Sequence, residues 1–158
     1  MKFSIININA LSGILAQIYS IQFEDKVVTE LRNFIYKFED THDDLLKKTI
    51  SRIQTISNRN GLQSSFFRRE SPPTHNVFRL LKTKDLRLYC ILLKNIILIF
   101  GSGGQKKFGT IKLSENPGLD AEVDELMKIE DCINKRLITG ELKITSNGFE
   151  GNLLDFVL

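Results

Sequence analysis

The side chains best suited to chemistry in this chain are the cations and one tyrosine near its middle. Between positions 64 and 107 the sequence has nine Lys or Arg residues and two Asp or Glu residues, whereas the rest of the chain has thirteen basic and seventeen acidic residues. The formal charge of the whole chain is only +3. A basic stretch in such a chain indicates a polyanionic ligand such as nucleic acid, or an acidic protein partner. The alternative is that these cations are spread over a solvated surface.

The basic residues accompany three apolar segments that alternate like β-strands, 77–82, 86–93 and 96–100. Short connections between them predict an antiparallel meander. Because side chains alternate across a strand, Arg87 and Tyr89 share one face, and Arg79 lies near Arg87 if the register allows. Conventional catalytic groups are scarce, so any chemistry at this face would have to depend on Arg, Lys and Tyr side chains. The alternative is that the final hairpin covers this face, with the arginine stem packed and its head exposed.

Further cations flank these strands, and we expect them to contact the phosphates of RNA: Arg68, Arg69, Lys82, Lys84, Lys106 and Lys107. Such contacts give an affinity for nucleic acid that depends on salt and little on sequence. Tyr89, Phe66 or Phe67 would stack on bases. For the two phenylalanines, packing in the core is the simpler interpretation.

Other kinds of site have little support. His75 precedes the basic strands and would act as an acid or base if it reaches the cationic face, the alternative being an ordinary loop histidine. His42 is expected at a helix start, in a capping or solvent-facing role. Cys90 and Cys132 belong to no CxxC or Cys/His cluster, so we expect no metal and no cofactor. The segment GSGGQKKFGT lacks the spacing of a nucleotide-binding loop.

The surrounding elements predict a single α+β domain, 1–158. Segments 2–9 and 18–23 alternate like strands and form an N-terminal strand pair, 1–24. Helical periodicity follows on both sides of EDTHDD, and Gly61 is placed to end the second helix. We expect these two helices to form an αα-hairpin.

After the meander, GSGG is expected to end the third strand, and a further helix is predicted over 118–137. Asn147-Gly148 predicts a C-terminal β-hairpin within 138–158. The predicted fold is thus a central antiparallel sheet packed by the αα-hairpin and the later helix. The sequence does not indicate which sheet the N-terminal strands join. Polar residues interrupt the N-terminal segment too often for a membrane span, and we expect a cytoplasmic protein with no membrane partner.

The stretch FRLLKTKDLRLYCILLKNIILIFGSGGQKK resembles the core of the RelE/HigB-like toxins of bacterial type II toxin–antitoxin pairs, particularly the phage-derived HigB-like branch. Those toxins have an arginine-bearing strand, a strand of the form Arg-x-x-Tyr, an apolar strand and a Lys-Lys exit. Arg79, Arg87, Tyr89 and Lys106–Lys107 occupy comparable places, although Arg87 and Tyr89 are two residues apart rather than three. The resemblance covers 25–137 and implies a RelE/ParE-like fold.

The resemblance implies a metal-independent endoribonuclease that cuts mRNA, in association with the ribosome, by attack of the RNA's own 2′-hydroxyl. Arg79 and Arg87 would hold the scissile phosphate, and Lys106 or Lys107 the flanking backbone. Tyr89 would stack on a base or move a proton. The implied partner is a cognate antitoxin, commonly a helix-turn-helix protein. The alternatives are a non-catalytic module on the same fold that binds nucleic acid or protein, and a phage structural or accessory protein.

Overall fold

A computed structural model of the chain describes residues 1–106 and 117–158, except for the side chains of 117–120. The helices are α1 (Glu30–Thr55), α2 (Pro117–Thr139) and two short helices, η1 (Ile56–Asn60) and η2 (Ser64–Phe66). The strands are β1 (Lys2–Asn7), β2 (Gln17–Phe23), β3 (Phe67–Arg69), β4 (Val77–Leu80), β5 (Leu86–Leu93), β6 (Ile97–Gln105), β7 (Leu142–Thr145), β8 (Gly148–Gly151) and β9 (Phe156–Val157).

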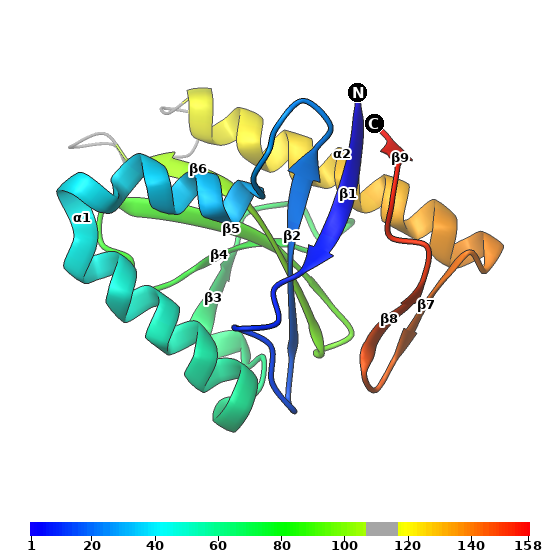
Figure 1. The fold of residues 1–158 in the computed structure, drawn as a ribbon, viewed down its shortest axis with the longest axis horizontal. Coiled ribbons are helices and arrows are strands. Elements are labelled where there is room, and N and C mark those ends of the chain that lie inside the picture. The colour runs from blue at the N-terminus through cyan, green and yellow to red at the C-terminus, as the bar shows by residue number, and fades with distance from the viewer. Residues whose placement is uncertain (107–116) are drawn as a thin grey trace.

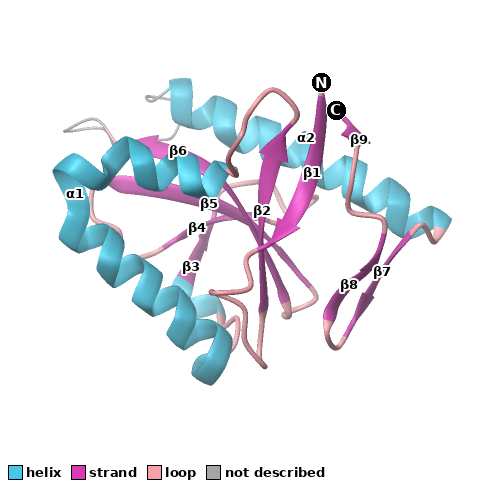
Figure 2. Ribbon diagram, in the orientation of Figure 1, coloured by secondary structure: helices cyan, strands magenta, loops and turns pink. Residues whose placement is uncertain are grey.

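A seven-stranded sheet with the order β3-β4-β5-β6-β2-β1-β9 forms the middle layer. Helix α1 covers one face of this sheet, and α2 covers the other together with the separate β7–β8 hairpin (Figure 1, Figure 2). The protein is therefore α+β, with apolar cores on both faces of a mixed sheet.

The expected meander is confirmed, because β4, β5 and β6 are antiparallel neighbours, and the short strand β3, which was not predicted, pairs with β4 at its edge. The expectation that GSGG ends the last of these strands is wrong, since β6 continues to Gln105. Gly103 pairs with Leu88, and a β-carbon at Gly103 would lie 1.6 Å from the carbonyl oxygen of Arg87. Glycine is thus the residue that lets the two backbones approach closely enough to extend the ladder.

The N-terminal strands belong to the same sheet. Strand β2 pairs with β6 in parallel, and β1 pairs with β2 in the antiparallel sense, so the predicted all-antiparallel sheet is corrected to a mixed one. The buried Ser20 Oγ donates to the carbonyl of Phe100 and accepts from the backbone N–H of Leu31, both at 3.0 Å. This single hydroxyl joins β2, β6 and the first turn of α1.

The two predicted helices are the two segments of α1, which meet at a kink at His42 instead of being joined by a separate loop. His42 has the non-helical angles φ −133° and ψ 34°, and the helical segments on its two sides point in different directions (Figure 1). The EDTHDD segment therefore forms a bend within α1 rather than a loop. Gly61 follows η1 with φ +76°, as its predicted role at a helix end requires. The face of α1 that packs on the sheet includes Leu31, Phe34, Phe38, Leu46 and Ile53.

The other face of the sheet is closed by α2 and the last strands. The α2 side chains that enter this core are Val123, Leu126, Ile129 and Ile133. The predicted β7–β8 hairpin is confirmed, and Gly148, the first residue of β8, has φ +104°. The Tyr19 hydroxyl accepts a hydrogen bond from the backbone N–H of Phe149 at 2.9 Å, which attaches the hairpin to β2. In the described part of the chain, neither long helix has an apolar run sufficient to cross a membrane.

Candidate anion-binding surface

Three arginines from three successive strands lie on the α2-facing side of the sheet. Arg68 of β3 is directly opposite Arg79 of β4, and Arg79 is directly opposite Tyr89 of β5. Directly opposed residues project from the same face. Arg87 shares the side of Tyr89, because Leu86 and Leu88 on either side of Arg87 enter the α1-side core. We call Arg68, Arg79 and Arg87 the arginine surface.

In the described part of the chain, Glu70 is the carboxylate that forms an ion pair with this surface. The Arg79 Nε donates to Glu70 Oε1 at 2.7 Å, and the two side chains are 15% and 14% exposed. Arg68 is exposed and Arg87 is partly buried. Burial, followed by the positive charge of Arg79, lowers the pKa of Arg87, although a guanidinium stays protonated at any physiological pH. Three guanidinium groups beside the Glu70 carboxylate make this part of the sheet cationic.

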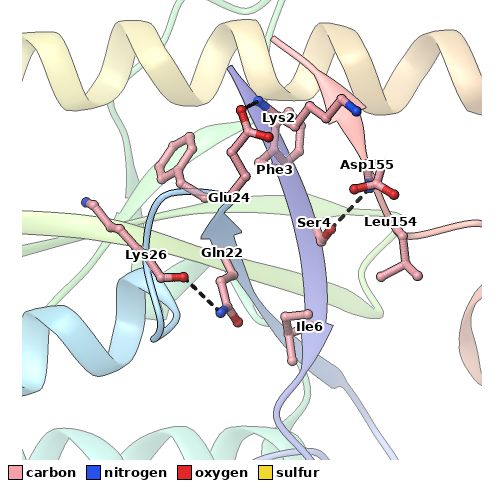
Figure 3. A pocket seen from close by; sticks show the side chains of 10 residues that line it. Lys2, Phe3, Ser4, Ile6, Gln22, Glu24, Lys26, Leu154 and Asp155 are labelled. Atoms are coloured by element: carbon pink, nitrogen blue, oxygen red, sulfur yellow. Dashed lines mark hydrogen bonds between the residues drawn. The ribbon is translucent and has the colours of Figure 1, made fainter.

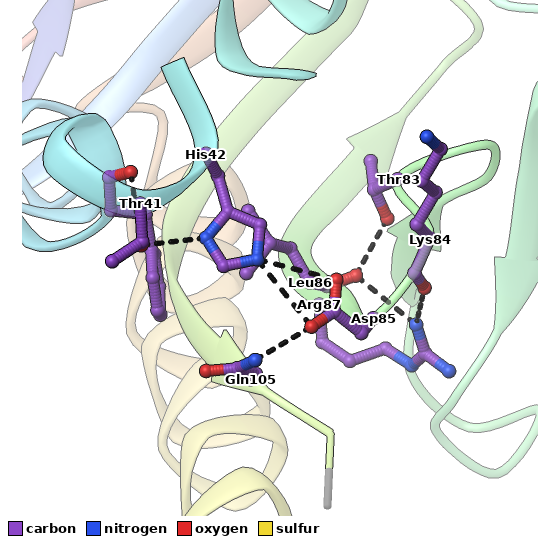
Figure 4. A network of polar contacts seen from close by, with 9 residues as sticks. Thr41, His42, Thr83, Lys84, Asp85, Leu86, Arg87 and Gln105 are labelled. Atoms are coloured by element: carbon purple, nitrogen blue, oxygen red, sulfur yellow. Dashed lines mark hydrogen bonds and ion pairs between the residues drawn. The ribbon is translucent and has the colours of Figure 1, made fainter. Parts of the chain in front are cut away.

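The cations continue round the β4–β5 turn. The Arg87 Nη1 donates to the carbonyl of Lys84 at 2.6 Å (Figure 4). From α1, Arg52 donates to the carbonyls of Leu81 and Lys82, and burial lowers the pKa of Arg52. Lys82 and Lys84 have φ of 62° and 53°, and both side chains are exposed. The turn is therefore held by arginines through its carbonyls while its lysines face solvent.

A polar network beside this turn joins α1 to the sheet (Figure 4). The His42 Nε2 lies 3.4 Å from each carboxylate oxygen of Asp85, and its Nδ1 lies 2.7 Å from Thr41 Oγ1. The Gln105 Nε2 donates to Asp85 Oδ2 at 2.6 Å. Desolvation would raise the pKa of Asp85, but the hydrogen bonds from Gln105 and His42 outweigh it and lower that pKa.

The sequence reasoning missed this network. His42 lies at the kink of α1, directly before its second helical segment, but its imidazole contacts Asp85 rather than facing solvent. Its partner Asp85 is 43 residues away, and no spacing or motif links the two. The bend is what turns the imidazole toward the β4–β5 turn, so only the fold reveals that His42 supports the turn that carries Arg87.

Tyr89 does not reach the surface. Its side chain is 1% exposed and belongs to the core between the sheet and α2. Desolvation, followed by the negative charge of Glu70, raises the pKa of its phenol well above the usual range. The expectation that Tyr89 stacks on a base is wrong for this fold, because α2 covers the part of the sheet that was expected to be open.

Two other predicted site residues lie away from the arginine surface. Arg69 projects from the opposite face, with its guanidinium 4.7 Å from the ring centre of Phe78, and it donates to the carbonyl of His75. The His75 Nε2 is 2.9 Å from Asp131 Oδ1 of α2. His75 therefore joins the β3–β4 connection to α2 rather than facing the arginines. Phe67 is 6% exposed and packs in the α1-side core, as the simpler interpretation predicted.

The lysines at the end of β6 are only partly described. The backbone N–H of Lys106 donates to the carbonyl of Asp85 at 2.7 Å, which places Lys106 beside the β4–β5 turn. Lys107 lies outside the described residues. Within residues 1–106 and 117–158, no group of three or more His, Cys, Asp or Glu side chains is arranged to hold a metal ion.

A separate pocket of about 260 Å³ lies at β1 and β2 near the C-terminal end of the chain (Figure 3). Its lining contains two cations, Lys2 and Lys26, and two carboxylates, Glu24 and Asp155. It contains none of the predicted site residues. The formal charges of these four side chains balance, unlike those of the arginine surface.

Comparisons with known proteins identify no relative of this chain. No protein-family model matches it, and no curated protein and no solved structure is significantly similar to it. Any functional assignment therefore depends on the geometry of the chain's own side chains.

Proposed function

We propose that this protein binds nucleic acid through the arginine surface, by contacts to the sugar-phosphate backbone. The observation that carries the proposal is that Arg68, Arg79 and Arg87 come from adjacent strands and share one side of the sheet. Like charges held this close repel one another, and water and salt only screen that repulsion. A phosphate removes it, and the fork of a guanidinium matches two phosphate oxygens.

The layout of the cations favours a linear polyanion. The arginine surface lies on the α2-facing side of the sheet, where Arg68 is exposed and Arg79 and Arg87 are partly buried, and it continues into the exposed Lys82 and Lys84 of the β4–β5 turn. A chain of phosphates can contact several of these groups at once, and each contact releases counterions from the nucleic acid. The predicted affinity is therefore strongly dependent on salt and weakly dependent on base sequence.

A metal-independent endoribonuclease of the RelE/HigB type is the second candidate. The observation that favours it is that Arg79 and Arg87 share a face, as the resemblance implies. Two guanidinium groups would neutralise the charge that develops on the phosphate during attack by the 2′-hydroxyl. The burial of Tyr89 removes the residue expected to stack on the RNA. For that reason we rank binding above cleavage.

The binding proposal is tested by titrating the protein into fluorescently labelled single-stranded RNA, single-stranded DNA and duplex DNA at several salt concentrations. We expect the logarithm of the affinity to fall linearly with the logarithm of the salt concentration. Arg87→Ala should weaken binding to every sequence and reduce the salt slope by about one. Lys143→Ala, an exposed cation on β7, is the matched control and should bind like the wild type. An affinity that is independent of salt, or unchanged by Arg87→Ala, contradicts the proposal.

Cleavage is tested separately by inducing the protein in a bacterial host and mapping the ends of the transcripts. New mRNA ends that appear with the wild type and disappear with Arg87→Ala would support the endoribonuclease. Intact transcripts together with salt-sensitive RNA binding in vitro would leave the binding module as the function.

A further inference from the structure

We infer that Glu70 is an internal competitor for the Arg79 guanidinium, and that this competition restricts the ligand of the arginine surface to a chain of several phosphates. The inference rests on the proposed nucleic-acid binding and adds the feature that selects the ligand. The Glu70 carboxylate occupies the position on Arg79 that a phosphate oxygen would take, 2.7 Å from Nε.

The backbone holds the Glu70 carboxylate at this position. Glu70 directly follows β3, and its N–H donates to the carbonyl of Val77 at 2.9 Å. The next residue, Ser71, is buried, and its N–H donates to the same carbonyl at 3.2 Å. Releasing Arg79 therefore requires only a rotation of the Glu70 side chain and leaves the β-ladder intact.

The rest of the β3–β4 connection is fastened to α2. The backbone N–H and the side-chain amide of Asn76 donate to the two carboxylate oxygens of Glu130, at 2.7 Å and 2.8 Å. Glu130 is 1% exposed, and the His75–Asp131 contact lies beside this pair. The connection does not need to swing for a ligand to enter, so Glu70 remains close to Arg79 whether or not it is paired.

A tethered group competes at its effective concentration, which is about millimolar or higher for a short tether. A single small anion of similar intrinsic affinity for Arg79 displaces Glu70 only when its free concentration exceeds the effective concentration of the Glu70 carboxylate. A phosphodiester chain meets a different condition, because one phosphate on Arg68 or Arg87 makes its contact with Arg79 intramolecular as well. Glu70 therefore selects against free phosphate and carboxylate metabolites and in favour of a polymer.

The test compares wild type, Glu70→Gln and Glu150→Gln in titrations of a short labelled single-stranded RNA at fixed ionic strength. Glu150→Gln removes the same charge from an exposed site on β8 and controls for the change in net charge. We expect Glu70→Gln to bind the RNA about two- to tenfold more tightly than Glu150→Gln. We also expect inorganic phosphate, used as a competitor, to displace RNA at lower concentrations from Glu70→Gln than from the wild type.

Two further variants separate competition from a structural role. Glu70→Asp keeps the charge but shortens the reach toward Arg79, so it should also bind RNA more tightly than the wild type. In an Arg79→Ala background, Glu70→Gln should behave like Glu150→Gln, because the group it competes for is gone. Thermal melts establish whether each variant is folded. If Glu70→Gln does not fold, the comparison of RNA affinities is made with Glu70→Asp instead.

The outcomes distinguish the inference from the function on which it rests. If wild type binds RNA and depends on Arg87, but Glu70→Gln binds no more tightly than Glu150→Gln, the role of Glu70 is overturned and the binding site stands. If wild type binds no nucleic acid at any salt concentration, the proposed function fails and the inference fails with it.

Discussion

Arg68 and Arg79 lie directly opposite each other on the antiparallel strands β3 and β4. Like charges in this arrangement destabilise a sheet, and the pairing is found on an edge strand of only three residues. Glu70 supplies one negative charge beside Arg79, and under the proposed function a bound phosphate chain would supply more. Stability and binding should therefore respond in opposite directions when one of the two arginines is removed.

The first prediction is that removing Arg68 changes stability and RNA binding in opposite directions. Arg68→Ala should raise the free energy of unfolding by about 0.2–1 kcal/mol at low salt, since it removes the repulsion from Arg79. The gain should shrink at high salt, where the repulsion is screened. The same variant should bind RNA more weakly. Urea denaturation and RNA titration measure the two effects, with Lys143→Ala as the control. A loss of stability in Arg68→Ala would contradict this prediction. It would show that packing of the aliphatic part of Arg68 on the sheet stabilises the fold by more than the repulsion from Arg79 destabilises it.

The second prediction concerns the buried tyrosine. Tyr89→Phe keeps the ring that fills the core, so the variant should fold and bind RNA with an affinity close to that of the wild type. Tyr89→Ala should lower the free energy of unfolding by about 3–5 kcal/mol, because it leaves a cavity between the sheet and α2. Denaturation and binding assays on the two variants check this. A large loss of RNA binding or cleavage in a folded Tyr89→Phe would return Tyr89 to the functional site.

The third prediction is a pH dependence that comes from Glu122 of α2. Desolvation raises the pKa of Glu122 from its ordinary value of 4.5 to about 7, and the charges of Glu125 and Glu30 add to the effect against the opposing influence of Lys37 and Lys26. A carboxyl whose pKa is higher in the folded state favours the folded protein while it is protonated. Its contribution is complete below about pH 4.5 and is lost as the pH rises to about 7.

Glu122→Gln removes this titration. The difference in the free energy of unfolding between Glu122→Gln and the wild type should grow in favour of the variant from pH 4.5 to pH 7 and then remain constant. Urea denaturation at closely spaced pH values measures the difference, from which the contributions of groups common to both proteins cancel. A difference that does not change with pH would show that Glu122 titrates normally.

The fourth prediction tests the close approach of β5 and β6. Gly103→Ala places a β-carbon 1.6 Å from the Arg87 carbonyl oxygen, so the ladder must open there. We expect a loss of about 2 kcal/mol or more in the free energy of unfolding, and weaker RNA binding because Arg87 is displaced. Gly140→Ala is the control, since its φ of +83° is strained but its β-carbon meets no atom within 4 Å. Equal losses in the two variants would mean that backbone conformation, rather than the contact with Arg87, sets the cost.

The sequence by itself determined the local elements and the two faces of the central strand. Alternation along β5 placed Arg87 and Tyr89 on one face, and the structure has Tyr89 in the α2-side core while Leu86 and Leu88, on either side of Arg87, enter the α1-side core. The Asn147-Gly148 pair marked its hairpin, and Gly61 marked a helix end. These features depend on side-chain period and turn chemistry within a few residues, which a single sequence contains in full.

Only the tertiary structure decided which face is covered and which charges meet. Alternation cannot reveal that α2 buries Tyr89, that β2 enters the sheet in parallel beside β6, or that the bend at His42 reaches Asp85. Each of these contacts joins segments far apart in the chain. Their relative placement follows from burying apolar surface across the whole molecule, a driving force that has no direction and leaves no local periodic signal.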